Sequence, residues 1–194
     1  MRNAENHFDK LFLSIKELLS FGYSYYQITK LTAAGKLRKL NRTNYENLDY
    51  VGEKSDFYYA TVYAPQGVIC LLSAAVFWQL STHRPIAMDV ALPRKRKLYT
   101  KPSWPKFDLY YFDEKRYNIG VQTIVEGMNT FKVYDPEKTV IDVLHYREKI
   151  GIETVKEVLT HYLSMKNHDL NKLYHYASQL NTAETLRSYL EILL

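Results

Sequence analysis

Helical spacing of apolar residues begins near residue 14, and polar pairs mark where two helices start. Ser14 with Glu17, and ten residues later Ser24 with Gln27, fit the capping-box pattern. In that pattern the Ser side chain accepts a hydrogen bond from the third helical amide, and the Glu or Gln side chain reaches back to the cap amide. Gly22 supplies the reversal that ends the first helix. The sequence therefore predicts two short helices joined by a tight turn.

A hairpin follows the second helix, which is predicted to end at Gly35. Residues 36–48 are interpreted as strand, polar turn and strand. Two helices joined by a turn containing Gly form a helix-turn-helix, and a hairpin directly after them makes it a winged one. We expect this domain to cover residues 1–48, with a short extra helix over residues 4–10 completing a three-helix core.

The 3.6-residue period divides the second helix into two faces. Ile28 and Leu31 form its buried stripe, flanked by Tyr25 and Thr32, while Gln27 is committed to the cap. The opposite face would enter the major groove of DNA and could reach phosphates, base edges or thymine methyl groups. That face carries Tyr26, Thr29, Lys30 and Ala33. The alternative is that Tyr25 and Tyr26 pack against the neighbouring domain.

Positive charge gathers in the same segment. Between Ser14 and Tyr45 there are six Lys or Arg residues and one acid, Glu17, whereas the whole chain carries a net charge of only +5. Clustered cations favour DNA, because each one placed on a phosphate releases condensed counterions. A solvated face is the plainer interpretation. The candidate DNA contacts of the hairpin are Lys36, Arg38, Lys39, Arg42 and Asn44.

The rest of the chain alternates between strand and helix patterns. Residues 49–56 are polar and predict a linker, followed by a C-terminal domain over residues 57–194. Asp135, with Pro136 after it, marks a strong helix start. Helices are expected at 56–64, 70–80, 135–149, 152–165, 169–179 and 182–193, and strands at 85–92, 107–112, 119–126 and 129–134. The predicted fold class is α+β: an N-terminal winged helix-turn-helix followed by a mixed α+β C-terminal domain.

Metal-binding patterns are absent from the sequence. His161, His168 and His175 recur every seven residues, but no HExxH or Cys/His ligand set accompanies them, so we interpret them as surface or locally satisfied histidines. The single cysteine, Cys70, is interpreted as a small buried apolar residue. We expect neither a metal nor a cofactor.

Catalytic patterns are equally sparse. Asp89, Asp108 and Asp113 could mimic the carboxylates of a nucleotidyltransferase, but no Gly-Ser turn precedes them to hold phosphates. A glycine-rich nucleotide loop and a nucleophile elbow are also missing. Residues 1–6 lead into an amphipathic stretch, and the longest apolar run, residues 68–78, is too short to cross a bilayer. We expect a cytoplasmic protein that is not an enzyme and has no membrane contact.

The predicted elements follow one another in a distinctive order. A helix-turn-helix and its wing come first, then a helix with a Ser-Ala pair, a strand ending in Leu-Pro, a hairpin, and a helix with the sequence Pro-Glu-Lys-Thr-Val-Ile-Asp. The segments concerned are Gly22–Tyr45, Leu72–Ala75, Val90–Pro93 and Val133–Asp142. Their order and spacing resemble the AbiEi family, the antitoxins and transcriptional repressors of bacterial abortive-infection (type IV toxin–antitoxin) systems. The wing of that family often reads Leu-x-Arg-Gly-x-Tyr. Here Thr43 replaces the Gly, so we expect Asn41 or Asn44 to supply the positive φ of the turn.

The resemblance implies an antitoxin of a phage-defence system that is also a transcriptional autorepressor. Its N-terminal domain would bind inverted repeats in its own promoter, and its C-terminal domain would counteract a nucleotidyltransferase-like toxin without requiring a tight complex. The residues by themselves indicate only DNA binding. Two alternatives stay open: a winged-helix regulator with a ligand-sensing C-terminal domain and no toxin partner, and an enzyme in which the winged helix docks a partner.

A second group of cations follows the strand expected at 85–92. No acid interrupts this loop, which contains Arg94, Lys95, Arg96, Lys97, Lys101 and Lys106. Residues 107–194, in contrast, carry ten basic and thirteen acidic residues. We expect the loop to make a second anionic contact, with operator phosphates beside the first site or with a nucleic acid shared with the toxin. A solubilising loop is the alternative.

Overall fold

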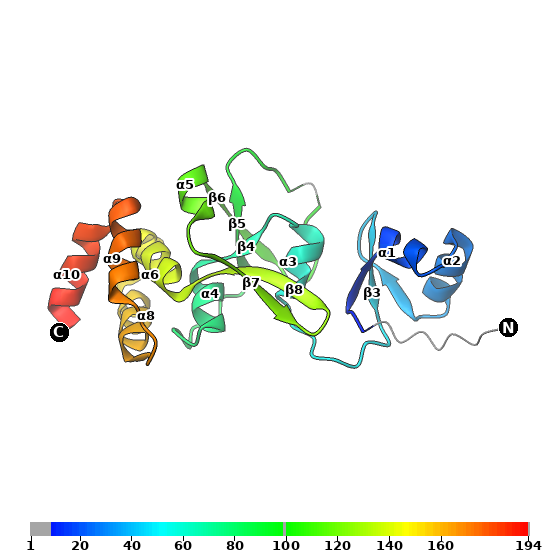
Figure 1. Cartoon of the computed structure of the whole chain (residues 1–194), viewed down its shortest axis with the longest axis horizontal. Coiled ribbons are helices and arrows are strands. Elements are labelled where there is room, and N and C mark those ends of the chain that lie inside the picture. Colours follow the sequence, from blue (N-terminus) through cyan, green and yellow to red (C-terminus); the bar gives the residue numbers. More distant parts are fainter. Residues whose placement is uncertain (1–8, 99, 194) are drawn as a thin grey trace.

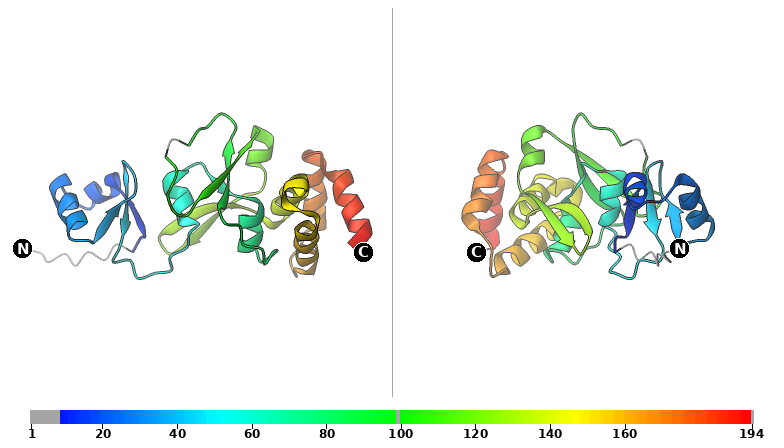
Figure 2. Two further views of the ribbon diagram at one scale, coloured as in Figure 1. Left: turned by 180° about the vertical axis from the view of Figure 1, so that it is seen from behind. Right: turned by 45° about the vertical axis from the view of Figure 1, so that its right-hand side comes forward.

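The computed structural model describes residues 9–98 and 100–193, arranged along one long axis (Figure 1). An N-terminal unit of short helices and strands lies at one end, a sheet with its helices in the middle, and the C-terminal helices at the other end. The same order is visible from behind and after a turn of 45° (Figure 2). The chain is a mixed α+β protein, as the sequence predicts.

The N-terminal unit is a three-stranded antiparallel sheet packed against two helices. Its elements are β1 (Phe12–Ser14), α1 (Ile15–Ser20), α2 (Tyr25–Ala33), β2 (Leu37–Lys39) and β3 (Asn44–Asn47). The strands lie in the order β1-β3-β2. Of the helix expected over residues 4–10, residues 4–8 lie outside the described residues, and residues 9 and 10 are not helical. The strand β1, which was not predicted, pairs with β3 at the edge of the small sheet.

Both capping boxes are confirmed. The amide of Glu17 donates to the Ser14 hydroxyl (3.2 Å), and the Ser14 amide donates back to the Glu17 carboxylate (2.8 Å). Ser24 and Gln27 repeat the arrangement at 3.3 and 2.8 Å. Gly22, with φ of 88°, turns the chain between the two helices in a conformation that costs other residues about 1 kcal/mol or more. The start of α2 is therefore fixed by its own first turn, and burial of Ile28 against Leu18 and Leu37 sets which face of the helix points inward.

The central sheet has five strands in the order β6-β5-β4-β8-β7. The strands are β4 (Val68–Ile69), β5 (Met88–Pro93), β6 (Phe107–Phe112), β7 (Val121–Glu126) and β8 (Asn129–Tyr134). Strand β5 is parallel to β6, and β4 is parallel to β8. The helices between the strands are α3 (Tyr58–Tyr63), α4 (Leu71–Phe77) and α5 (Glu114–Asn118). Strand β4 and helix α5 were not predicted, because each is too short for a periodic pattern.

The chain ends in a group of helices whose apolar core also includes Ala75 of α4 and Leu80. They are α6 (Pro136–His145), α7 (Arg147–Ile150), α8 (Ile152–Ser164), α9 (Leu170–Gln179) and α10 (Ala183–Leu193). Asp135 caps α6 as predicted, accepting from the Lys138 amide at 2.8 Å. Helix α6 ends at His145, however, and α7 covers the rest of the predicted helix. Within the described residues, no helix combines the length and the hydropathy needed to cross a membrane.

The N-terminal unit packs directly on α3 and the sheet. Leu11 and Phe12 are buried in the same apolar cluster as residues of α3 and β8, and the ring of Phe12 lies 4.7 Å from that of Tyr59. The Leu11 amide donates to the Asn129 side chain at 2.9 Å. Residues 49–56 form neither helix nor strand. The division into domains at these residues stays a prediction, but the two parts of the chain share buried contacts.

Candidate nucleic-acid interface

Helix α2 presents an exposed face that nothing else in the described chain covers. Tyr26, Thr29, Lys30 and Ala33 are all exposed, while Ile28 on the opposite side is buried. Tyr25 and Tyr26 are 65% and 69% exposed, so the alternative that they pack against the neighbouring part of the chain is wrong. Tyr25 consequently does not flank the buried stripe either. The ammonium of Lys30 lies 5.2 Å from the centre of the Tyr26 ring, within cation–π range.

Three cations of the β2–β3 hairpin are exposed and unpaired. Lys36, Lys39 and Arg42 make no ion pair within the part of the chain that the structure describes. The same holds for Lys30 on α2. Unpaired cations keep their full charge for an anionic partner, so these four side chains form the positive surface of the N-terminal unit.

Arg38 differs from these cations. Its guanidinium donates to the carboxylate of Glu46 on the neighbouring strand, with Nε 2.9 Å from the oxygen. Glu46 is 5% exposed, and its hydrogen bond with Arg38 raises the pKa of the guanidinium. Glu46 directly follows the segment Ser14–Tyr45, so the hairpin carries less net positive charge than that segment alone indicates. The DNA contact of Arg38 stays a prediction, but its charge is already compensated within the hairpin.

The hairpin turn is closed by a side chain. The side-chain oxygen Oδ1 of Asn41 accepts from the backbone amides of Thr43 (3.0 Å) and Asn44 (2.9 Å), as in an Asx turn. No residue of the turn has a positive φ, so the expectation that Asn41 or Asn44 adopts one is wrong. The Asn44 amide group donates to Asn41 and to Thr43, at 3.1 and 3.0 Å. Asn44, predicted to contact DNA, is thus half-buried and engaged in the turn.

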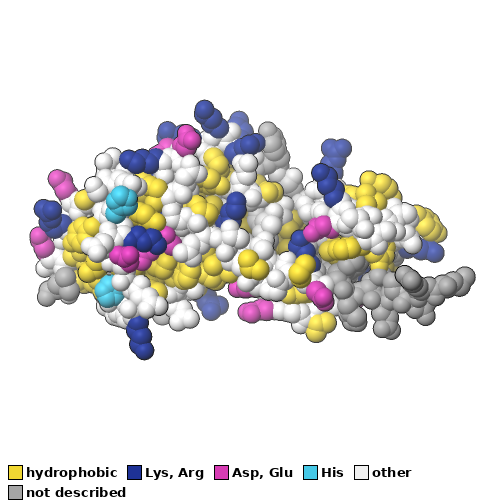
Figure 3. All heavy atoms as spheres, in the orientation of Figure 1, with side chains coloured by type: hydrophobic (Ala, Val, Ile, Leu, Met, Phe, Trp, Pro, Cys, Tyr) yellow, Lys and Arg dark blue, Asp and Glu magenta, His cyan; other side chains and the backbone are white. Residues whose placement is uncertain are grey.

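The second cationic group lies on the loop between β5 and β6. Arg94, Lys95, Arg96, Lys97, Lys101 and Lys106 are all exposed. None of them forms an ion pair with another described residue. Two backbone hydrogen bonds of 2.8 Å, from Arg94 to Phe112 and from Arg96 to Pro93, hold the start of the loop against the strand ends. Figure 3 shows Lys and Arg side chains along the upper edge of the molecule, over this loop and over the N-terminal unit.

The three aspartates considered as a nucleotidyltransferase set do not converge. Asp89 and Asp108 are neighbours on the parallel strands β5 and β6. Asp113 lies five residues farther along the chain, about 16 Å at 3.3 Å per residue, and caps α5 by accepting from the Arg116 amide. Asp89 is buried, and its carboxylate accepts from the Ser73 amide (3.2 Å), a contact that sequence patterns do not predict. Burial raises its pKa to about 6.

The remaining candidate side chains have local partners. Cys70 is fully buried, as predicted, and burial raises the pKa of its thiol. Nδ1 of His161 lies 3.0 Å from the Leu80 carbonyl oxygen, and Nδ1 of His168 lies 2.7 Å from that of Met165. His175 contacts the Gln179 amide at 3.0 Å. Among residues 9–98 and 100–193, no three His, Cys, Asp or Glu side chains are grouped so as to hold a metal ion.

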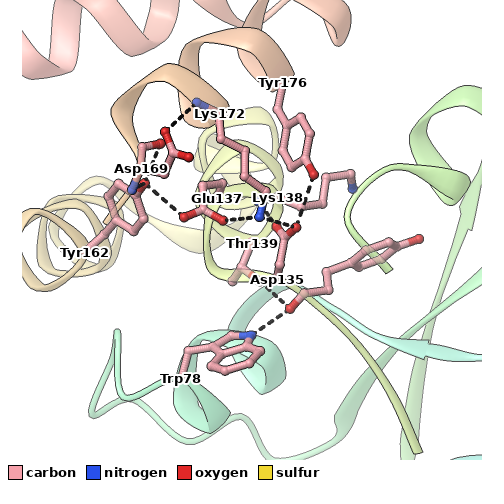
Figure 4. A network of polar contacts seen from close by, with 10 residues as sticks. Trp78, Asp135, Glu137, Lys138, Thr139, Tyr162, Asp169, Lys172 and Tyr176 are labelled. Carbon is pink, nitrogen blue, oxygen red and sulfur yellow. Dashed lines mark hydrogen bonds and ion pairs between the residues drawn. The ribbon is translucent and has the colours of Figure 1, made fainter. Parts of the chain in front are cut away.

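Charged side chains also gather at the start of α6, far from the cationic edge. Lys172 of α9 lies 3.0 Å from the Asp135 carboxylate and 2.9 Å from that of Glu137 (Figure 4). Deeper in the core, Asp142 accepts from Arg116 (2.6 Å) and from Lys138. Asp142 and Lys138 are both fully buried. Each of these charges has a partner of opposite sign, and the pairs connect the end of the sheet and α5 to α6 and α9. We therefore interpret them as stabilising the packing of the C-terminal helices on the sheet.

No protein-family model matches the chain, and no curated protein matches it either. Three features of the described chain favour a nucleic-acid interface: the exposed face of α2, the unpaired cations of the hairpin, and the cationic β5–β6 loop.

Proposed function

We propose that this chain binds double-stranded DNA and represses transcription, with α1, α2 and the β2–β3 hairpin acting as a winged helix-turn-helix. The observation that carries the proposal is the exposed face of α2. A capping box fixes where α2 begins, and burial of Ile28 leaves the opposite face of the helix exposed. Four unpaired cations lie on this face or on the hairpin that follows it. An α-helix of this kind fits the major groove, and cations next to it neutralise phosphates.

Each exposed side chain has a role in this proposal. Tyr26 and Lys30 have the length to reach base edges or phosphates, whereas Thr29 and Ala33 can contact thymine methyl groups. Lys36, Lys39 and Arg42 would contact the backbone, which fixes the register of the protein on the duplex without selecting a sequence. We leave Arg38 and Asn44 out of this set, because Glu46 and the hairpin turn engage them.

We propose the biological setting from the resemblance to the AbiEi family. In that setting the chain represses its own operon by binding inverted repeats in the promoter, and it opposes a nucleotidyltransferase-like toxin encoded beside it. The order of the segments supports this: Leu72–Ala75 lies in α4, Val90–Pro93 ends β5, and Val133–Asp142 spans the junction of β8 and α6. A neighbouring reading frame that encodes such a toxin, and protection of cells that express it, would test this part separately.

Titration of fluorescent upstream DNA against salt concentration tests the DNA binding. Replacing Lys30→Glu and Arg42→Glu together should abolish measurable binding to the promoter. The milder pair Lys30→Ala and Arg42→Ala should flatten the slope of log K against log salt by roughly 0.9 for each lost phosphate contact.

The matched control is Lys166→Glu with Arg187→Glu. Both residues are exposed on the C-terminal part, and the change in net charge is the same four units. The control should bind promoter DNA almost as the wild type does. If the Lys30 and Arg42 charge reversals also retained wild-type binding, α2 and the hairpin would not be the part that reads DNA.

A further inference from the structure

The β2–β3 hairpin and the β5–β6 loop are far apart in sequence, yet they line one cleft. The hairpin turn contributes Arg42 and Thr43, the loop contributes Lys97 and Thr100, and Tyr63 at the end of α3 also lines the cleft. The cleft has a volume of about 290 Å³, far more than the ~30 Å³ that one water molecule occupies. A cation therefore lies on each wall of an open cleft that is lined by both polar and apolar side chains.

Packing beneath the cleft fixes the two walls relative to each other. Leu40, which follows β2 at the hairpin turn, packs against the same apolar cluster as Tyr63 and as Leu98 of the loop. The Tyr63 hydroxyl donates to the Leu40 carbonyl oxygen (3.1 Å), and the Asn41 amide group donates to that of Val62 (3.3 Å). The hairpin turn is thus attached to α3, and the loop is attached to the same core one residue after Lys97.

The chemistry of the walls selects an anion. Arg42 and Lys97 make no ion pair within the described residues, and the exposed Thr43 and Thr100 bring hydroxyl groups to the same cleft. Further exposed cations belong to the same two segments: Arg94, Lys95 and Arg96 precede Lys97 in the loop, and Lys36 and Lys39 precede Arg42 in the hairpin. Figure 3 shows Lys and Arg side chains over both regions of this edge of the molecule. A row of cations suits a polyanion better than a single small ion, because each phosphate neutralised releases further counterions.

We infer that the cleft holds the sugar–phosphate backbone of duplex DNA next to the segment read by α2. This inference rests on the proposed function and extends it: the β5–β6 loop, outside the helix-turn-helix, becomes part of the DNA-binding surface. Attraction between exposed charges is screened beyond about 8 Å at physiological salt, so the loop acts only where it touches DNA. The binding site on DNA must then be longer than the segment covered by α2 and the hairpin.

Two duplexes separate this inference from the proposed function. One carries only the segment protected by α2 and the hairpin, and the other extends it on both sides. Replacing Arg94, Lys95, Arg96 and Lys97 together with Ser should weaken binding of the long duplex at least tenfold, which corresponds to about 1.4 kcal/mol. Binding of the short duplex should not change. The control pair Lys166→Glu with Arg187→Glu, which alters the net charge by the same amount, should leave both affinities nearly as they are.

Directed cleavage places the DNA in the cleft. Cys70 is buried, so a cysteine introduced by Thr43→Cys or by Thr100→Cys is the exposed thiol to which a DNA-cleaving iron chelate can be attached. The two conjugates should cut the long duplex within a few nucleotides of each other, outside the segment that α2 covers.

The outcomes are distinct. If the wild type bound neither duplex, the proposed function itself would fail. If the wild type bound both but the fourfold Ser variant held the long duplex with wild-type affinity, or the Thr100→Cys conjugate cut no DNA, the inference would be overturned while the proposed function stood. Wild-type DNA binding by the fourfold variant with loss of toxin neutralisation would also overturn it, in favour of a protein partner.

Discussion

Replacing Asp142 with Asn should destabilise the protein more than almost any other single removal of charge. The Asp142 carboxylate is fully buried and accepts from both Arg116 and Lys138. The substitution keeps the shape of the side chain but leaves two cations in the core without an anion. Breaking a buried ion pair in this way typically costs about 3–5 kcal/mol, which for a chain of this length lowers the melting temperature by roughly 10 °C.

The loss of stability in Asp142→Asn should become smaller as the pH rises. Burial lowers the pKa of Lys138, and the charge of Asp142 opposes this effect. Without that charge the folded-state pKa of Lys138 falls further below the unfolded value of about 10.4. Between the two values the folded state binds fewer protons than the unfolded state, so stability rises as the pH rises. The gap between variant and wild type should therefore narrow from pH 7 towards pH 10.

Urea denaturation followed by Trp78 fluorescence measures this directly. The Trp78 indole donates to the Tyr134 carbonyl oxygen (2.7 Å), next to the charged network, and Trp104→Phe removes the exposed second tryptophan. Glu148→Gln is the control, because the Glu148 side chain is 91% exposed and should change stability by less than about 0.5 kcal/mol. A loss below about 1 kcal/mol for Asp142→Asn, or a gap that stays constant with pH, would refute the reasoning.

Three further measurements address other features. Burial raises the pKa of Asp89 to about 6, so between about pH 4 and 6 the folded state binds a proton that the unfolded state has lost. In urea denaturation at pH 8, Asp89→Asn should therefore be more stable than the wild type by roughly 1–3 kcal/mol, and this difference in stability should disappear by pH 4. Gly22→Ala should cost about 1 kcal/mol through backbone strain alone, since a Cβ there meets no other atom within 4 Å; a neutral result by thermal denaturation would contradict this. In salt titrations of DNA binding, Arg42→Ala should flatten the slope of log K against log salt by roughly 0.9, and Arg38→Ala should flatten it by much less. Arg38→Ala should instead lose stability, because Glu46 stays buried without its partner; equal slopes for the two variants would contradict their different roles.

Helix starts were predictable because they depend on neighbouring residues. The Ser14–Glu17 and Ser24–Gln27 pairs, and Asp135 before Pro136, each complete their hydrogen bonds within one turn of helix. Strands β6 and β8 were also predicted to the residue, because turn residues bound their patterns on both sides. Local patterns of this kind hold wherever tertiary packing agrees with them.

Elements that depend on distant partners were missed. Strand β4 has only two residues, Val68 and Ile69, and exists because β5 and β8 lie on either side of it. Strand β1 likewise forms by pairing with β3. No short window of sequence contains these partners, so residues 68–69 were assigned to no element and only the helix expected at 70–80 was predicted there. The pairing of Arg38 with Glu46 has the same origin, since the two face each other only across the β2–β3 hairpin.

The cleft between the hairpin and the β5–β6 loop is the strongest case of this kind. Sequence identifies both groups of cations, because runs of Lys and Arg without acids are visible in any count. The two groups line one cleft because Leu40, Tyr63 and Leu98 pack on the same apolar core. Nothing in the sequence around any one of these three residues indicates that it brings the two groups of cations together. Exposed cations repel each other, so two such groups stay side by side only where other contacts hold them. The apolar core beneath the cleft provides those contacts, and a polyanion bound across both walls would relieve the repulsion that the core sustains.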